Sequence, residues 1–325
     1  MELLRDADID PEPLAGKRVA ILGYGNQGRA QSLNLKDSGI DVVVGLRGGS
    51  GSSLEAQSAG LETALLEDAV GSADIVMMLA PDETHAALYR EVEPHIRTGS
   101  ALGFSHGLSV RFQFVEPRSD LDVFMVAPKG PGTALRSLYQ QGKGMIGLWA
   151  VEQDATGRAA SIALAYGKAI GCGRAGLIAS SFAEVAEADL FNEQAVVWGG
   201  VPELLIAGFE TLVAGGIAPE VAYLECVGEL HLIAELIEAR GIAGMREAIS
   251  NTAELGALLG GTRIIDKSVR ERMSDVLAEV RAGKFADELR AEEATGYERL
   301  EKARAEALDA LLQKTYRRLG EGEEG

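Results

Sequence analysis

Cysteine and aromatic residues are both scarce in this chain. Of its 325 residues only Cys172 and Cys226 carry thiols, and Phe, Trp and Tyr together make up 5%. Two thiols cannot build a disulfide framework, and their number fits a reducing compartment. Because hydrophobic residues still account for 46% of the chain, we expect a sizeable core made mainly of Leu, Val, Ile and Ala.

Basic residues are outnumbered, with 31 Lys and Arg against 49 Asp and Glu and a formal net charge of −18. An acidic surface repels phosphate backbones and anionic lipid, which argues against nucleic-acid and membrane partners. The apolar stretch 201–218 is interrupted by Pro202, Glu203 and Glu210, so we expect no span across a bilayer. The acidic N-terminus resembles neither a secretory signal nor a transit peptide. We expect a cytoplasmic protein.

Short apolar runs alternate with helical stretches over the first half of the chain. The runs lie at 17–22, 41–46, 73–79, 100–106 and 120–128, and two more, 145–151 and 174–180, are expected to continue the same sheet. Strands that alternate with helices predict a parallel sheet covered on both faces, an α/β Rossmann arrangement. From about residue 181 the pattern is helical throughout. We therefore predict a dinucleotide-binding domain over 1–181 and an all-α domain over 182–325.

A glycine-rich turn, GYGNQG, follows the first apolar run and opens a helix. Gly23 permits the tight turn, Gly25 lets the backbone approach a pyrophosphate, and Gly28 lets helix and strand pack closely. Gly-rich turns are common, and the alternative is an ordinary connection between a strand and a helix. The order strand, turn, helix, strand favours a dinucleotide site. The predicted binding residues are Gly23, Tyr24, Gly25, Asn26, Gln27 and Gly28.

The end of the second run bears on the choice between NAD and NADP. An NAD site usually places Asp or Glu there, to bind the ribose 2′-hydroxyl. This run instead ends in Arg47, and Ser50 and Ser52 follow. A guanidinium and two hydroxyls suit a 2′-phosphate, which favours NADP. The alternative is that Arg47 is a solvated loop residue.

Two pairs of carboxylates stand out in the helical half, Asp189 with Glu193 and Glu225 with Glu229. Spacing of four residues places each pair on one helix face, where two like charges cost stability unless a cation neutralises them. Magnesium prefers such oxygen ligands, and four carboxylates can hold two ions. In so acidic a chain the alternative is coincidence on solvated faces. Apolar neighbours such as Leu190 favour partly buried faces and hence the metal interpretation.

Two loops and one helix start complete the candidate site. His106 follows the fourth run and Lys129 follows the fifth, so both lie at the carboxyl edge of the predicted sheet, where ligands bind. His106 could carry a proton and Lys129 could stabilise negative charge, and Gly132 in the same loop as Lys129 joins the cofactor-binding set. The alternatives are a structural histidine and a surface lysine. Ser250 is either a helix cap or a donor to a substrate carboxylate.

Taken together in this order, the segments GYGNQG, VVVGLRGGSGS, FSHG, FMVAPKGPG, EADLFNEQ, FETLVAGGIAPEVAYLEC, GELHLI and ISNTAE resemble ketol-acid reductoisomerase in its short class I form, over residues 1 to about 285. The resemblance implies magnesium-dependent alkyl migration of 2-acetolactate or 2-aceto-2-hydroxybutyrate. Reduction by NADPH then gives a 2,3-dihydroxy acid, in the biosynthesis of valine, isoleucine and leucine. It also implies a knotted helical domain that forms homodimers, which sometimes stack into dodecamers.

The resemblance also assigns roles to individual residues. Asp189 matches the bridging metal ligand and Glu193 a ligand of the first ion. Glu225 and Glu229 match ligands of the second ion that come from the partner subunit, and Glu229 is counted among the catalytic residues as well. Ser250 matches the residue that holds the substrate carboxylate.

In the same way, His106 and Lys129 match the polar catalytic pair. Arg47, Ser50 and Ser52 match the residues that bind the 2′-phosphate.

The chain departs from the family pattern at several positions. Arg29 and Gln31 stand where His residues are usual, Asn192 replaces a Gly between two metal ligands, and Trp198 replaces a Cys. The last two changes leave the choice of substrate open. Three alternatives therefore remain: a relative acting on a different 2-acetohydroxy acid, a non-catalytic NADP-sensing protein, and a hydroxyacid dehydrogenase that needs no metal.

Overall fold

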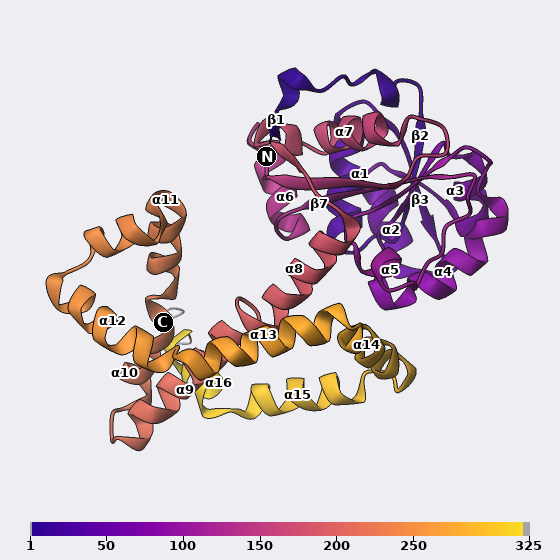
Figure 1. Ribbon diagram of the computed structural model, residues 1–325. Helices are drawn as coiled ribbons and strands as arrows, with labels where there is room; N and C mark the ends of the chain where they lie inside the picture. The colour runs from indigo at the N-terminus through magenta and orange to yellow at the C-terminus, as the bar shows by residue number, and fades with distance from the viewer. Residues whose placement is uncertain (1, 321–325) are drawn as a thin grey trace. The chain divides into compact units, whose positions relative to one another are not determined.

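The computed structural model describes residues 2–320. These form two compact units, one ending at Ala188 and one beginning at Asp189 (Figure 1). The division falls inside helix α8 (Phe182–Ala195), a few residues beyond the division at 181/182 that the sequence suggested. Each unit is described by itself below.

A nine-stranded sheet, in the order β1-β9-β8-β7-β6-β5-β2-β3-β4, is formed by the described residues of the first unit. The strands are β1 Leu3–Leu4, β2 Arg18–Leu22, β3 Asp41–Leu46, β4 Glu62–Leu65, β5 Ile75–Met78, β6 Ala101–Phe104, β7 Asp122–Pro128, β8 Gly147–Gln153 and β9 Leu177–Ala179. Each apolar run predicted from the sequence is one of these strands. The edge strands β1 and β4 were not predicted, because one has two residues and the other, ETAL, carries little apolar pattern.

The sheet is mixed rather than wholly parallel, which corrects one expectation. β4, β3, β2, β5, β6 and β7 run parallel, but β8 runs antiparallel to β7. The chain enters β8 at the carboxyl end of β7, where Pro128 pairs with Gly147 and the Lys129 amide donates to the Ile146 carbonyl at 2.9 Å. Helix α6 (Gly132–Gln140) and the loop after it return the chain to the carboxyl end of β7, so β8 runs in the opposite direction to β7.

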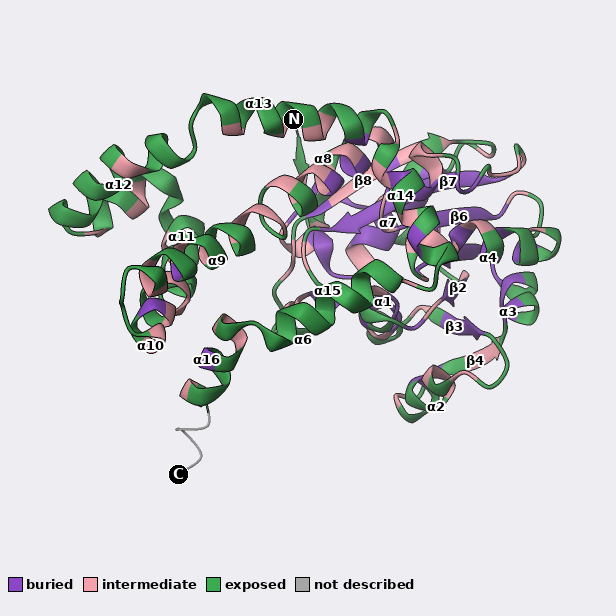
Figure 2. Cartoon of the chain, turned by 90° about the horizontal axis from the view of Figure 1, so that it is seen from below, coloured by how far each residue is buried: buried purple, intermediate pink, exposed green. Residues whose placement is uncertain are grey.

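Helices cover both faces of the sheet, as the alternating pattern predicted. Leu35 and Tyr166 belong to the core on one face, and Val70 and Leu88 to the core on the other. The central strands β2, β3, β5, β6 and β7 between them are almost entirely buried (Figure 2). The helices of this unit are α1 Asn26–Asp37, α2 Gly51–Ser58, α3 Leu66–Ser72, α4 His85–Val92, α5 Leu108–Arg111, α6 Gly132–Gln140 and α7 Ala159–Ala169.

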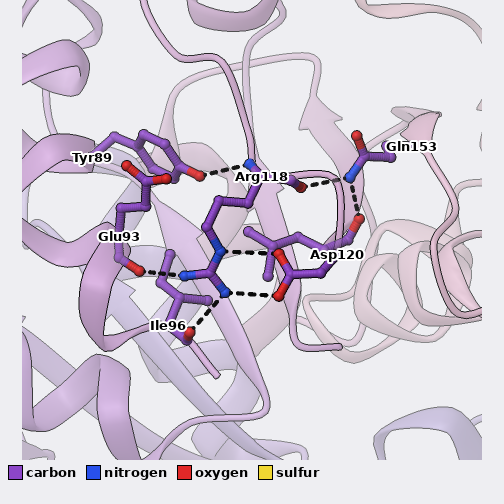
Figure 3. Close-up of polar contacts among 7 residues, drawn as sticks. Tyr89, Glu93, Ile96, Arg118, Asp120 and Gln153 are labelled. Atoms are coloured by element: carbon purple, nitrogen blue, oxygen red, sulfur yellow. Dashed lines mark hydrogen bonds and ion pairs between the residues drawn. The ribbon is translucent and has the colours of Figure 1, made fainter. Parts of the chain in front are cut away.

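Arg118 stabilises the irregular segment that leads into β7 (Figure 3). Its guanidinium pairs with both oxygens of Asp120, at 3.0 and 3.1 Å, and donates to the carbonyls of Glu93 and Ile96. The Tyr89 hydroxyl accepts a hydrogen bond from the backbone amide of Arg118. One side chain thus satisfies two carbonyls that have no strand partner, which fixes the loop without regular structure.

The second unit is helical, and no strand follows β9 among residues 180–320. Its helices are α8, α9 Gly200–Ala214, α10 Pro219–Tyr223, α11 Leu230–Ala248, α12 Asn251–Ile264, α13 Lys267–Arg281, α14 Lys284–Ala294, α15 Glu298–Asp309 and α16 Leu311–Gly320, with a π-helical turn, η6, at Leu224–Gly228. The helical pattern is interrupted at Ile249 and Ser250, where α11 ends and Ser250 caps α12.

Few side chains of the helical unit are buried, and many large apolar ones are exposed (Figure 2). Leu255, Leu258 and Leu259 on α12 are each more than half exposed. Contiguous exposed apolar surface is typical of sites that bind another protein, a membrane or a ligand.

One stretch of this unit bears on the expectation that no segment spans a bilayer. The stretch Phe182–Ala214 contains an 18-residue window with a mean hydropathy of 1.4, and by length and composition alone it could cross a membrane. Pro202, Glu203 and Glu210 interrupt it less than expected, because many aliphatic residues surround them. The stretch is two helices, α8 and α9, with residues 196–199 between them. The same composition suits helices whose apolar sides pack against protein.

Candidate functional site

The glycine-rich turn has the geometry that a dinucleotide site requires. Gly23 adopts φ of 101°, which favours glycine, and a Cβ there would lie 2.7 Å from the Ala80 nitrogen. A Cβ on Gly28 would lie 2.1 Å from the Gly23 carbonyl oxygen, so only glycine fits. Gly25, in contrast, faces open space, with no atom within 4 Å of its Cβ position. The turn is closed by two glycines and left accessible at the third, at the N-terminus of α1.

A cavity of about 260 Å³ adjoins this turn. It is lined by Gly23 and Tyr24 from the turn, by Arg47 and Ser50 from the loop after β3, and by Ser52 from the start of α2. The structure thus brings together five residues that the sequence predicted for the cofactor. The Tyr24 hydroxyl is buried and has no hydrogen-bond partner among the described residues. An unsatisfied buried hydroxyl beside a glycine cradle fits a bound nucleotide.

Arg47 is largely exposed and forms an ion pair at 3.7 Å with Glu91 on α4. It is therefore neither buried in the core nor fixed by a strong partner. A pair this exposed is weak, so its guanidinium can turn toward a phosphate at little cost.

The turn also contacts the loop that follows β7. The Asn26 side-chain oxygen accepts from the Thr133 amide at 3.1 Å, and the Gln27 side chain donates to the Gly130 carbonyl at 3.0 Å. Gly132 lies so close that a Cβ there would meet the Asn26 carbonyl oxygen at 2.1 Å. Gly132 thus belongs structurally with the turn, as its place in the predicted cofactor set requires.

His106 lies in the loop after β6, next to the carboxylate of Asp82. Its Nδ1 is 3.5 Å from Asp82 Oδ2, and the Leu108 amide is 3.4 Å from the same nitrogen. Asp82 belongs to the short 3₁₀ helix η3 (Asp82–Thr84), which follows β5. The neighbouring strands β5 and β6 therefore bring an acid and an imidazole together at one edge of the sheet.

A second histidine, His85, lies behind this pair. It is buried, with Nε2 2.9 Å from the Ala80 carbonyl, Nδ1 2.7 Å from the Ser109 hydroxyl and the Asp82 carboxylate at 3.7 Å. Because a carbonyl only accepts, Nε2 carries the proton. The candidate site proposed from the sequence included neither His85 nor Asp82. The signal was the segment PDETH directly after the third run, at the same edge as His106.

The buried His85 predicts a loss of stability in mild acid. Burial lowers the pKa of His85 below its ordinary value of 6.5, against the raising effect of Asp82. The unfolded chain therefore binds a proton near pH 6.5 that the folded chain refuses, and stability falls as the pH drops below that value. Burial raises the pKa of Asp82, but His106, His85 and Ser109 together outweigh this effect, and the net pKa is lowered. The stability that ionised Asp82 contributes is therefore lost only as the pH falls below the ordinary carboxyl pKa of 3.8.

The measurement is the urea midpoint at pH 5.5 and pH 7.5 for the wild type and for His85→Gln, in which the amide preserves a donor toward Ala80. We expect the wild type to lose more stability between the two pH values than the variant. Equal losses would show that His85 does not titrate differently in the folded chain.

Lys129 and Ser250 take the positions that their segments predicted. Lys129 is exposed in the loop after β7, at the same sheet edge as the His106 loop. Ser250 is the N-cap of α12, and its hydroxyl oxygen accepts from the Ala253 amide at 3.2 Å. The capping role is thus present, and it leaves the hydroxyl proton available to donate.

The four carboxylates lie on two helical segments. Asp189 and Glu193 are one turn apart on α8, with Asp189 half-buried. Glu225 lies in the π-helical turn η6, and Glu229 follows it. Both are exposed, so the partly buried face expected for Glu225 is not found within one chain. π-Helical turns occur frequently at functional sites.

Among residues 2–320, no group of three or more His, Cys, Asp or Glu side chains is placed to hold a metal ion. The donor chemistry nevertheless fits magnesium, since each segment offers two carboxylates one turn apart and magnesium prefers oxygen. Within residues 2–320 the two pairs do not come together in one group that could hold an ion.

The sheet, the glycine cradle and the adjoining cavity define an oxidoreductase of the nicotinamide-dinucleotide class. Two family models then match almost the whole chain: acetohydroxy acid isomeroreductase, NADPH-binding domain, over residues 13–176, and ketol-acid reductoisomerase, C-terminal domain, over residues 182–321. The chain belongs to the ketol-acid reductoisomerase family, which confirms the resemblance seen in the sequence.

Solved structures agree with this assignment. A ketol-acid reductoisomerase from an uncultured archean, described as NADH-preferring, is 41% identical and matches with a TM-score of 0.95 over 99% of both chains. A putative oxidoreductase from Jannaschia sp. CCS1 is 19% identical, with a TM-score of 0.63 over 82% of this chain and 97% of that one. An NAD-binding semialdehyde dehydrogenase protein from Cupriavidus necator is 16% identical, with a TM-score of 0.62 over 82% and 99%. The last two share the fold alone.

Proposed function

We propose that the chain converts 2-acetolactate or 2-aceto-2-hydroxybutyrate to the 2,3-dihydroxy acid by magnesium-dependent alkyl migration and reduction by NADPH. The observation that carries the proposal is the presence of both carboxylate pairs, Asp189 with Glu193 and Glu225 with Glu229, in a member of this family. A nucleotide sensor or a plain hydroxyacid dehydrogenase has no need of four such ligands.

The roles of the residues follow from their chemistry. Bound magnesium would supply Lewis acids for the charge that develops on adjacent oxygens, and the nicotinamide would supply the hydride. Asp189, Glu193, Glu225 and Glu229 would hold the ions. Each of these carboxylates offers only acceptor oxygens at neutral pH, which is what the cations require.

Polar side chains would bind and orient the substrate. The Ser250 hydroxyl, which accepts a hydrogen bond from its own helix, would donate a hydrogen bond to the substrate carboxylate. Lys129 would stabilise negative charge on a substrate oxygen. With Asp82 beside Nδ1 of His106, Nε2 is the nitrogen that would exchange a proton with the substrate.

A substrate panel tests the proposal. NADPH oxidation is followed with 2-acetolactate, 2-aceto-2-hydroxybutyrate and analogues with larger alkyl groups. We expect the first two to be turned over best. Preference for a larger analogue would favour a relative that acts on a different 2-acetohydroxy acid. Trp198 and Asn192 motivate this alternative, and Trp198 is 69% exposed in the connection between α8 and α9. Absence of turnover with every substrate would favour the sensor.

We also propose that NADPH is preferred over NADH. Arg47, Ser50 and Ser52 line the cavity beside the turn, and no acidic side chain lines that cavity. A charge-assisted hydrogen bond contributes about 1.5–3 kcal/mol, which corresponds to roughly 10- to 100-fold in affinity. The related archaeal enzyme is described as NADH-preferring, so the preference differs within the family.

The prediction is that Arg47→Gln lowers the ratio of kcat/KM for NADPH over NADH by roughly 10- to 100-fold, mainly through KM for NADPH. Steady-state kinetics with each nucleotide measure this. Arg29→Gln, an exposed arginine at the start of α1 that does not line the cavity, is the control. An unchanged ratio in Arg47→Gln would show that Arg47 is a solvated loop residue.

We further propose that the chain acts as a homodimer, or a larger assembly of dimers, in the cytoplasm. The exposed apolar side chains of α11 and α12, among them Ile242, Leu255 and Leu259, would be covered by a second copy. The same partner would supply Glu225 and Glu229. Sedimentation analysis of the purified chain tests the assembly.

A further inference from the structure

Gln31 is a completely buried glutamine on α1, with no exposed surface. It lies one helical turn after Gln27 of the dinucleotide turn and is not among the residues expected to contact the nucleotide or the substrate. Burying an amide is costly unless its donors and acceptor are all satisfied. Its partners therefore show what the residue does.

Both donors and the acceptor of this amide are satisfied. Its nitrogen donates to the Gln27 side-chain oxygen at 3.0 Å and to the Ser105 hydroxyl at 2.8 Å. Its oxygen accepts from the Tyr166 hydroxyl at 2.7 Å. Burial raises the pKa of Tyr166 well above its ordinary value, so Tyr166 keeps its proton and the direction of this bond is settled.

The partners belong to the segments that carry the proposed chemistry. Gln27 lies in the dinucleotide turn and donates in its own turn to the Gly130 carbonyl, next to Lys129. Ser105 immediately precedes His106. Gln31 and Gln27 thus connect three loops that leave three different strands, and the Tyr166 hydroxyl on α7 donates to Gln31.

We propose that Gln31 is a positioning residue that sets the dinucleotide turn, the His106 loop and the Lys129 loop in mutual register. This inference deepens the proposed function, but its binding part needs only a nicotinamide cofactor. A network in which every member is satisfied is rigid, and small displacements of positioned groups have large effects on turnover.

The bonding pattern predicts that two substitutions act differently. Gln31→Glu keeps the shape and the acceptor for Tyr166 but removes both donors. To restore a partner, the Gln27 amide must rotate its nitrogen toward Glu, which breaks its bond to Gly130. Ser105→Ala removes only the connection to the His106 loop and leaves the turn intact.

Asn34 provides a matched control on the same helix. It is also completely buried, and its amide donates to the Ile170 carbonyl and accepts from Arg136, but it contacts none of the three loops. Asn34→Asp thus disturbs a buried amide of α1 without touching the network.

The experiment measures the Kd of NADPH by nucleotide fluorescence, kcat with 2-acetolactate, and the melting temperature of the full chain. For Gln31→Glu we expect Kd to rise and kcat to fall, each on the order of 10-fold. For Ser105→Ala we expect kcat to fall with Kd unchanged. For Asn34→Asp we expect a lower melting temperature with wild-type Kd.

Two results would overturn the inference. One is a Gln31→Glu variant with wild-type Kd and kcat. The other is an Asn34→Asp variant whose Kd rises as much as that of Gln31→Glu, which would reduce Gln31 to a general packing role. Failure of the proposed function is distinguishable, because the wild type would then bind NADPH without turning over 2-acetolactate, while the comparison of Kd values still stands.

Discussion

Asp189→Asn is expected to abolish turnover of 2-acetolactate, lowering kcat by about 10³ or more, while NADPH binding survives. Asn is nearly the same size as Asp, so the fold of α8 should be retained. It replaces an anionic acceptor with a neutral amide, which would weaken the binding of the magnesium ions that we propose. Steady-state kinetics and NADPH fluorescence on the same preparation measure the two effects.

Glu184→Gln is the control for this substitution. Glu184 lies on the same helix and accepts from Ser180 at 2.7 Å, outside both carboxylate pairs. We expect near wild-type turnover from it. An Asp189→Asn enzyme that retained substantial activity would refute the metal assignment, and one that also lost NADPH binding would indicate misfolding.

The second prediction concerns two inactive variants that restore activity when mixed. We expect Asp189→Asn and Glu229→Gln each to be inactive alone and to regain about a quarter of wild-type activity when co-expressed. Within the described residues of one chain the carboxylates do not assemble a metal site. If each site of a two-fold dimer takes Asp189 from one chain and Glu229 from the other, a mixed dimer has one intact site. Half the dimers are mixed, and half their sites are intact.

A matched pair distinguishes this from mere stabilisation by mixing. Asp189→Asn and Glu193→Gln both alter the pair on α8, so a mixed dimer of these two contains no intact site. We expect no recovery from that pair. Recovery in both mixtures, or in neither, would contradict a site shared between subunits in this way.

Local patterns predicted the parts of the molecule that depend on local physics. The turn at Gly23 and Gly28 was predictable because only glycine fits where a Cβ would lie 2.7 Å or less from backbone atoms. The apolar runs predicted strands because a strand that is buried on both faces is a nearly continuous run of apolar residues. Ser250 was predictable as a cap because serine oxygen satisfies a helix N-terminus.

Other features depend on contacts distant in sequence. The reversal at β8 follows from where the loop after α6 returns the chain, which no local pattern records. Asp82 and His85 precede His106 by some twenty residues, and only the pairing of β5 with β6 brings them together. The exposure of Glu225 depends on how the helices around η6 pack, which the apolar neighbours of Glu225 in the sequence do not record.

The departures from the family pattern have different consequences in the structure. Gln31 is integrated into a buried network that reaches three loops, so its replacement of a usual His is compensated by its surroundings. Trp198, in contrast, is exposed. Nothing in the structure explains why Asn192 replaces a Gly.

The most direct test of the central claim is NADPH oxidation with 2-acetolactate, measured with magnesium and again with EDTA. We predict turnover with magnesium and none with EDTA, because alkyl migration needs the ions that the four carboxylates would hold. Turnover that persists in EDTA, or its absence in both conditions while NADPH still binds, would contradict the account.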